Sequence, residues 1–198
     1  MTTFLQRQLR PAIALIVLLT LVTGLAYPVV VTAISQVVFP GQANGSLVVV
    51  NGQTLGSSLI GQAFNDPKYL WGRPSNAGVT PSNPAGYDGT ASGGSNLGPT
   101  SAALIKRIQA SIVTWQASNG SAPIPIDLLT TSASGLDPDI SPAGAEYQVA
   151  RVAKARNMTE DAVRAIIAKH TDQPILGFMG EPAVNVFEVN LDLDGLLK

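Results

Sequence analysis

Residues 11–39 read PAIALIVLLTLVTGLAYPVVVTAISQVVF, and this stretch decides the architecture of the chain. It contains no acidic or basic side chain, and after Arg10 the next charged residue is Asp66. At a rise of about 1.5 Å per residue, a helix of this length reaches about 43 Å, more than the ~30 Å hydrocarbon core of a bilayer. A soluble helix needs only one apolar face, so the sequence predicts a membrane-spanning helix that tilts or bends at Pro28.

The charges around this helix predict its direction across the membrane. Arg7 and Arg10 precede it, whereas the first charges after it are distant. The positive-inside rule therefore places residues 1–10 in the cytoplasm, residues 11–39 in the membrane and residues 40–198 outside the cytoplasm. A cleaved secretory signal is the alternative, but the apolar run is longer than the usual signal core and no clear A-x-A site follows it. An uncleaved, single-pass anchor is the favoured interpretation.

Length and composition limit what the rest of the chain does. A total of 198 residues allows one membrane helix and one compact domain. Only 13% of residues are charged, and the net charge of -1 provides no excess of Lys or Arg for a phosphate backbone. Nucleic acid is therefore not an expected partner. The absence of Cys removes disulfides, thiolate nucleophiles and sulfur-bound metals, and it suits a domain in an oxidising space.

Local patterns predict an α+β extracytoplasmic domain. Residues 47–50 and 53–59 flank Asn51-Gly52, a typical type I′ hairpin turn. Gly, Ser, Asn and Pro concentrate between residues 72 and 99, which indicates a long loop, and the apolar stripe of residues 99–115 predicts a helix after it.

Further along the chain, start signals predict two helices and a final strand. Ser141-Pro142 begins a helix that is expected to continue to Arg156, and Thr159 caps a second helix. Alternating apolar and polar residues predict a half-buried strand from Val184 to Leu191.

The motifs of independent enzymes are missing. The sequence contains no G-x-x-x-x-G-K-[ST] phosphate loop and no G-x-S-x-G elbow, and the single His170 cannot form a histidine metal cluster. His170 is interpreted as a solvated residue at a helix end rather than as a ligand. Basic residues in the helices between 141 and 169 are interpreted as a solvated face rather than as a DNA-reading surface: Arg151, Lys154, Arg156, Arg164 and Lys169.

The densest polar signal is the glycine-rich segment 87–100, YDGTASGGSNLGPT. Successive glycines before a helix can direct N–H groups at an anion, and carbonyls and hydroxyls there could bind a cation. A tight, packed loop that needs positive φ angles is the competing interpretation, favoured because the phosphate-loop Lys is missing. The sequence alone does not choose between these interpretations.

Seven motifs in one order make the chain resemble the C subunit of the Kdp-type potassium-transporting P-type ATPase along almost its whole length. They are Tyr27-Pro28, FPGQANGSL at 39–47, GSSLIGQAF at 56–64, GRPS at 72–75, ASGGSNL at 91–97, SASGLDP at 132–138 and RVAKARN at 151–157. One departure is Asp139, where the resemblance implies His in many relatives, so a role for an imidazole there does not carry over.

The resemblance implies a non-catalytic subunit of an ATP-driven potassium importer in the bacterial inner membrane. Its expected partners are a channel-like potassium-binding subunit, a P-type ATPase subunit, a further small membrane subunit and the lipid bilayer. The family is described as a catalytic chaperone for ATP use. That description implies no firmly bound cofactor, ATP contact in a ternary complex with the ATPase subunit, and five nucleotide candidates: Ser92, Gly93, Gly94, Ser95 and Gln148.

The topology argument conflicts with direct ATP contact, because ATP is cytoplasmic and the charge rule places those five residues outside. We therefore expect the exported domain to cover the outer potassium entrance and to act on ATP use at a distance. The alternative is a stand-alone anchored module that binds a periplasmic or cell-wall ligand, and an independent hydrolase is the third possibility.

Overall fold

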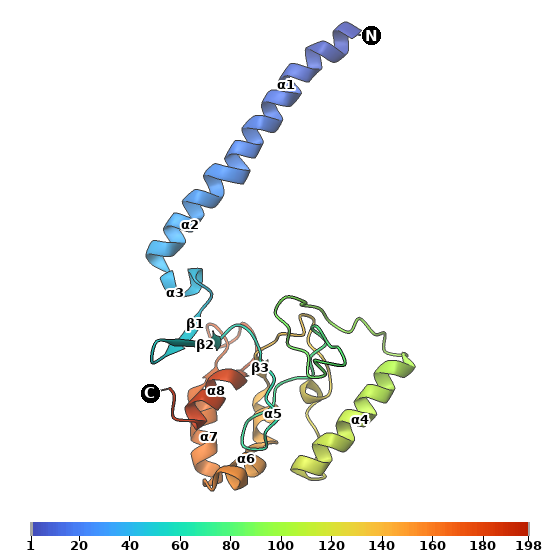
Figure 1. The fold of residues 1–198 in the computed structure, drawn as a ribbon, viewed down its shortest axis with the longest axis vertical. Coiled ribbons are helices and arrows are strands. Elements are labelled where there is room, and N and C mark those ends of the chain that lie inside the picture. Colours follow the sequence, from blue (N-terminus) through green and yellow to red (C-terminus); the bar gives the residue numbers. More distant parts are fainter. Residues whose placement is uncertain (1, 198) are drawn as a thin grey trace. The chain divides into compact units, whose positions relative to one another are not determined.

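The computed structural model describes residues 2–197, with side chains from Arg7 onward, and it divides the chain into two compact units, 1–47 and 48–198. The first unit is helical (Figure 1). It consists of α1 (Thr2–Leu21), a π-helical turn η1 (Val22–Ala26), α2 (Tyr27–Val38) and the short α3 (Pro40–Ala43). Residues 7–38 are apolar and long enough to span a membrane by length and composition.

The π-helical turn explains how the helix accommodates Pro28. The Tyr27 N–H donates to the carbonyl of Val22, five residues back, just before the proline, which has no N–H to donate. The Thr23 hydroxyl, in the same turn, donates to the Leu19 carbonyl four residues back at 2.7 Å. As Figure 1 shows, α1 runs on into α2 as one continuous rod.

The second unit combines helices with two small sheets. The hairpin β1 (Leu47–Val50) and β2 (Gln53–Ser57) turns at Asn51 and Gly52, whose φ angles of 51° and 78° confirm the predicted type I′ turn. The other sheet has the antiparallel order β3 (Asp139–Ile140), β5 (Ala183–Asn185), β4 (Thr171–Asp172). Ile140 and Thr171 both pair with Val184 of the central strand.

The remaining elements are helical and build the core. They are α4 (Ala102–Asn119), the 3-10 turn η2 (Ile126–Leu128), α5 (Pro142–Glu146), α6 (Val149–Arg156), α7 (Glu160–Lys169) and α8 (Val186–Leu193). Trp115, Leu128, Val152, Val163 and Val189 are among the side chains that meet in one buried cluster. Two caps are confirmed: the Ser141 hydroxyl accepts from the Gly144 N–H, and the Thr159 hydroxyl accepts from the Ala162 N–H.

Two predicted elements are wrong in part. The strand expected over 184–191 ends at Asn185, whose side chain accepts the Glu188 N–H at 3.0 Å and caps α8. Buried Val186, Val189 and Leu193 follow helical spacing, which the period-two pattern of 187, 189 and 191 concealed. The helix expected from Ser141 to Arg156 is two helices, because a tight turn, with the Gln148 N–H bonded to Ala145, separates α5 from α6.

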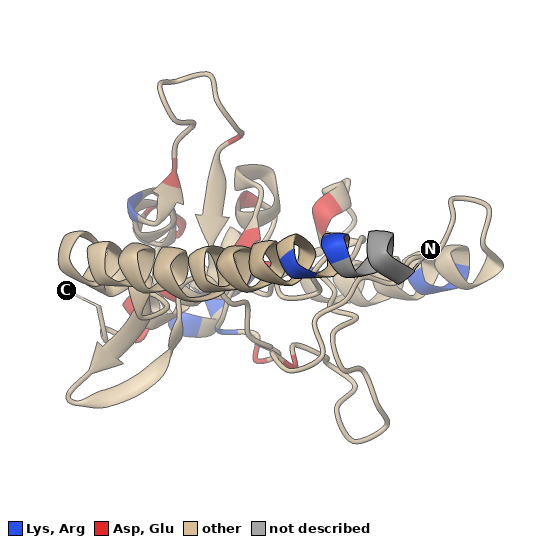
Figure 2. Cartoon of the chain, turned by 90° about the horizontal axis from the view of Figure 1, so that it is seen from above, with Lys and Arg blue, Asp and Glu red and all other residues tan. Residues whose placement is uncertain are grey.

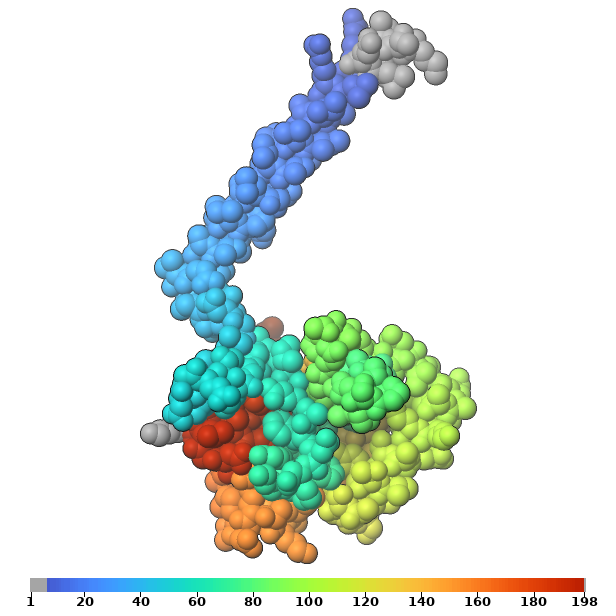
Figure 3. Space-filling model, in the orientation of Figure 1, coloured from blue at the N-terminus to red at the C-terminus, as the bar shows by residue number. Residues whose placement is uncertain are grey.

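The segment between β2 and α4 is the predicted long loop, extended at both ends. Residues 58–101 contain no helix or strand beyond an isolated bridge between Thr80 and Asn83. In Figure 3 this segment, turquoise to green, covers much of one face of the second unit. Its ordered shape depends on side chains and backbone groups elsewhere in the chain.

Candidate functional site around Arg73 and Asp139

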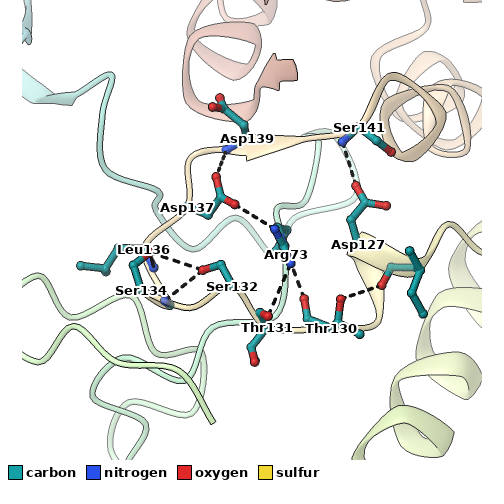
Figure 4. A network of polar contacts seen from close by, with 12 residues as sticks. Arg73, Asp127, Thr130, Thr131, Ser132, Ser134, Leu136, Asp137, Asp139 and Ser141 are labelled. Carbon is teal, nitrogen blue, oxygen red and sulfur yellow. Dashed lines mark hydrogen bonds and ion pairs between the residues drawn. The ribbon is translucent and has the colours of Figure 1, made fainter. Parts of the chain in front are cut away.

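Arg73 holds the long loop against the segment that leads into β3 (Figure 4). Its guanidinium forms an ion pair with Asp137 at 2.9 Å, and it donates to the carbonyls of Thr130 and Thr131, both at 3.4 Å. The other carboxylate oxygen of Asp137 accepts the Asp139 N–H at 3.1 Å. One arginine thus fixes the backbone on both sides of residues 132–136, and the planar fork suits this task better than a Lys would.

Short side chains shape the turn between Thr131 and Asp137. The Ser132 hydroxyl accepts the Gly135 N–H at 2.9 Å, and the Ser134 hydroxyl accepts the Leu136 N–H at 3.1 Å. Gly135 has a φ of 68°, and a Cβ there would lie 2.7 Å from the Gly93 carbonyl, so glycine is required. Nearby, Asp127 accepts the Ser141 N–H at 2.7 Å and holds the start of α5 (Figure 4).

Tyr87 and Ser75 tie the glycine-rich segment to the same place. The Tyr87 hydroxyl donates to the Arg73 carbonyl at 2.6 Å, and burial, reinforced by the charge of Asp137, raises the pKa of Tyr87 to about 12. The Ser75 hydroxyl donates to the Gly135 carbonyl and accepts the Tyr87 N–H. These contacts link both ends of the turn to residues 73–87.

Four of the five nucleotide candidates lie on this packed loop. The Gly93 N–H and the Ser92 hydroxyl both donate to the Ser134 carbonyl, at 2.8 Å and 3.1 Å. A Cβ on Gly94 would lie 2.9 Å from the Ala133 carbonyl, and Ser95 accepts a hydrogen bond from Thr131. This geometry favours the tight-loop interpretation of the segment, and α4 begins only at Ala102.

Gln148, the fifth candidate, lies in the core rather than with the other four. It is fully buried, and its amide bonds both to the N–H and to the carbonyl of Trp71, at 2.8 Å and 3.0 Å. It also donates to Gly144 and accepts from Arg151 at 2.6 Å. All hydrogen-bonding positions of the side chain are thereby used within the chain.

Asn190, which the sequence analysis missed, repeats this arrangement one residue earlier. Its amide accepts the Leu70 N–H at 2.8 Å and donates to the Leu70 carbonyl at 2.9 Å. Two buried amides thus hold the backbone of residues 70–71 as a neighbouring strand would. Helical spacing over residues 186–193 would have placed Asn190 on a buried face, but the sequence analysis expected a strand there.

The predicted solvated basic face is wrong for two of its members. Arg151 lies over the Trp71 ring, 4.0 Å from its centroid, and donates to the carbonyls of Pro67 and Tyr69. Burial lowers its pKa to about 10. Arg156 donates to the carbonyls of Lys68 and Leu193 and pairs with Asp194 at 2.7 Å. Both arginines are structural because they satisfy backbone carbonyls of the long loop and, for Arg156, the Leu193 carbonyl at the end of α8.

His170 also differs from its expected solvated position. Its side chain is only 9% exposed, and its ring nitrogens lie 2.8 Å from Asp192 and 3.3 Å from Glu188. Lys169 joins this group through Asp192 at 2.9 Å. The histidine therefore belongs to a polar network between the end of α7 and α8.

Two crevices that share Asp139 lie near β3, and each contains more acidic than basic side chains. The first, of about 230 Å³, lies beside Arg73, and its ionisable lining residues are Arg73, Asp127, Asp137, Asp139 and Glu181. The second, of about 410 Å³, is bordered by Asp139, Lys169, His170, Asp172 and Glu188. Asp139 lines both. Among residues 2–197, no group of three or more His, Cys, Asp and Glu side chains is arranged to hold a metal ion.

The surroundings of Asp139 disfavour the charged form of its carboxyl group. Burial first, then the charges of Asp137, Asp172 and Glu188, raise its pKa from 3.8 to about 6, against an opposing hydrogen bond from Asn185. The folded state therefore holds a proton that the unfolded state releases between about pH 4 and pH 6. Stability is lost as the pH rises through this window, and the full penalty applies above about pH 6.

The substitution Asp139→Asn should relieve this penalty at neutral pH. After discounting for the half-exposed side chain, we expect a gain of about 1 kcal/mol at pH 7.5, or about 2–4 °C in melting temperature. The gain should disappear below about pH 4. Thermal unfolding of the full chain in detergent measures both values, with Glu181→Gln, an exposed carboxylate, as the control. Equal gains at both pH values would contradict the assignment.

Comparison with known proteins gives one consistent result. The family model described as "KdpC: K+-transporting ATPase, c chain" matches residues 9–195. A protein named potassium-transporting ATPase KdpC subunit from Sorangium cellulosum is 53% identical over 189 residues, which cover 94% of this chain and 97% of the relative. Proteins of the same name from Bradyrhizobium diazoefficiens and Variovorax paradoxus are each 52% identical, covering 95% and 94% of this chain and 96% and 95% of theirs.

Proposed function

Because the chain belongs to the KdpC family, the c chains of K+-transporting ATPases, we propose that it is a non-catalytic accessory subunit of a high-affinity potassium import complex. The observation that carries this proposal is the match over residues 9–195, which includes both the apolar helix and the domain. The partners proposed are a channel-like potassium-binding subunit, a P-type ATPase subunit and a further small membrane subunit. The complex would reside in the bacterial inner membrane.

The proposed anchor is the apolar helix, with its N-terminus in the cytoplasm. Arg7 and Arg10 lie at its start, and Figure 2 shows the helix free of charged residues beyond that end. Their placement supports the inward orientation through the positive-inside rule. Gly24, a small residue in the π-helical turn before Pro28, would favour close packing against helices of partner subunits.

The domain outside the cytoplasm would cover the outer potassium entrance of the channel-like subunit. Past residue 40 the chain carries all thirteen of its acidic residues but only ten of its twelve basic ones, since Arg7 and Arg10 precede the helix. The crevices around Asp139 concentrate this negative charge. A cation entering within a Debye length, about 8 Å at physiological ionic strength, would be attracted to them.

The effect on ATP use would be indirect. A domain that binds two states of the pump with different affinity shifts their populations, and reported coupling free energies between distant sites of about 1–3 kcal/mol correspond to about 5–150-fold changes. Direct nucleotide contact through Ser92–Ser95 and Gln148 would instead require the opposite membrane orientation. Against it stands the use of the Gln148 amide by Trp71, Gly144 and Arg151.

Removal of residues 40–198, with the helix kept, tests the proposal. Full-length and truncated chains are each purified in mild detergent from cells that express the other subunits. We expect the full chain to elute with two larger membrane proteins, and the truncated complex to lose at least about fivefold of its potassium-stimulated ATP hydrolysis.

Two results would contradict the proposal at different points. A full-length chain that elutes alone would support the stand-alone anchored module and defeat the subunit assignment. Unchanged assembly together with unchanged hydrolysis after truncation would leave the subunit assignment intact but defeat the role of the domain at the potassium entrance.

A further inference from the structure

The connection between β4 and β5 presents large apolar side chains to solvent. Residues 173–180, QPILGFMG, form this connection, which we name the apolar finger. Four of its side chains are exposed: Ile175 by 70%, Leu176 by 79%, Phe178 by 76% and Met179 by 54%. The surface of a soluble protein seldom exposes four large apolar side chains within five consecutive residues. Exposed apolar patches of this kind mark interaction sites.

The backbone of the finger is ordered in a way that holds these side chains outward. Ile175 and Met179 exchange both N–H to carbonyl bonds at 3.0 Å, and the Gly177 N–H donates to Pro174 at 2.9 Å. Leu176 has a φ of 56°, a left-handed conformation that a leucine adopts at a cost. Leu176 thus lies at the tip of the finger in a strained backbone conformation, and its side chain does not pack into the core of the domain.

The charges beside the finger indicate what kind of surface covers it. The finger contains no charged residue, and acidic residues flank it on both sides, Asp172 before it and Glu181 after it. Figure 2 shows this pattern as an uncharged loop that projects from the sheet, with red at each of its two ends. Between Lys169 and Lys198 the sequence contains no Lys or Arg at all.

This charge pattern argues against lipid as the occupant. Segments that insert into the membrane interface usually carry Lys or Arg that meet anionic headgroups, and Trp or Tyr at the boundary. Residues 170–182 contain none of these four residue types. Asp172 and Glu181 would be repelled by an anionic surface, but they would complement basic side chains or N–H groups at the edge of a protein pocket.

We propose that the apolar finger docks into an apolar pocket of a partner protein in the ATPase complex, with the pocket edged by Lys, Arg or free backbone N–H groups. Leu176 and Phe178 are the anchors, since they are the most exposed and lie at the tip. Asp172 and Glu181 pair with the edge of the pocket. This inference rests on the proposed function as a subunit, and it specifies which surface of the domain meets a partner.

An environment-sensitive dye on Phe178→Cys tests this docking, and the absence of native Cys makes the label unique. The labelled full chain is placed in anionic lipid nanodiscs, alone and assembled with the other subunits. Val113→Cys, at an exposed site on α4, is the matched control. We expect a blue shift at position 178 only in the assembled complex, and none at position 113. A blue shift in lipid alone would make lipid the occupant, and no shift in the complex would also overturn the proposal.

A second variant separates this inference from the function beneath it. The double substitution Leu176→Ser and Phe178→Ser should speed dissociation of the chain from the detergent-purified complex at least fivefold, while its thermal unfolding stays unchanged. Val113→Ser should dissociate like the wild type. Wild-type-like dissociation of the double variant would refute the finger alone, whereas failure of the wild type to assemble at all would refute the proposed function.

Discussion

Replacing Gln148 by leucine will destabilise the domain by about 3–5 kcal/mol, a large part of the ~5–15 kcal/mol that typical domains possess. Leucine retains most of the volume, so the loss does not come from a cavity. It comes from the Trp71 N–H, the Trp71 carbonyl and the Arg151 guanidinium, which lose their common partner inside a dry core. Thermal or denaturant unfolding of the full chain in detergent measures the change.

The matched control is Gln116→Leu, because Gln116 lies on the exposed side of α4. We expect that substitution to change the unfolding free energy by less than about 0.5 kcal/mol. Equal effects of the two substitutions would show that Gln148 does not organise the long loop. The comparison also shows how to interpret activity measurements on Gln148→Leu. A loss of activity in this variant would be explained by unfolding of the domain and would not by itself indicate that Gln148 contacts ATP.

Elements that local chemistry determines were predictable from the sequence. The Asn51-Gly52 turn needs two positive φ angles, and the cap residues Ser141 and Thr159 act within three residues of their own position. The apolar helix follows from composition alone, because 29 residues without charge admit few other structures. These signals required no knowledge of distant parts of the chain.

Elements that depend on long-range partners were not predictable in this way. Asn190 bonds to Leu70 across 120 positions, and Gln148 bonds to Trp71 across 77, so no local window contains either pair. The same limit applies to Arg73 and Asp137, which lie 64 positions apart yet form the centre of the candidate site. The α8 helix was hidden for a different reason: apolar residues at 187, 189 and 191 satisfy a strand pattern as well as a helical one.

The candidate site shows why charge-bearing residues were misjudged while the loop was recognised. Arg151 and Arg156 were interpreted as part of a solvated face in which acidic residues alternate with basic ones, and His170 as a solvated residue after a helix. Each instead bonds to a group of another segment: Arg151 to the Tyr69 carbonyl, Arg156 to the Leu193 carbonyl at the end of α8, and His170 to the Asp192 carboxylate. Because the domain has little β-structure, many backbone groups of its long connections have no strand partner, and side chains must bond to them instead. We therefore expect side chains that bond to backbone carbonyls to be common in these connections.

The membrane orientation is the claim on which the rest of the account depends, and a single engineered Cys tests it. Ala91→Cys is suitable because Ala91 is exposed in the glycine-rich segment and the native chain has no Cys. Thr3→Cys, in the predicted cytoplasmic stretch, is the control. Both variants are treated with a membrane-impermeant thiol reagent, in intact cells whose outer envelope is permeable to the reagent and again after lysis.

We predict that position 91 is labelled fully in intact cells and that position 3 is labelled only after lysis. The reason is the lopsided distribution of Arg7 and Arg10 around an uncharged helix. The reverse result, with position 91 protected until the cells are broken, would place the domain beside cytoplasmic ATP. It would contradict the potassium-entrance account and favour direct assistance in nucleotide binding.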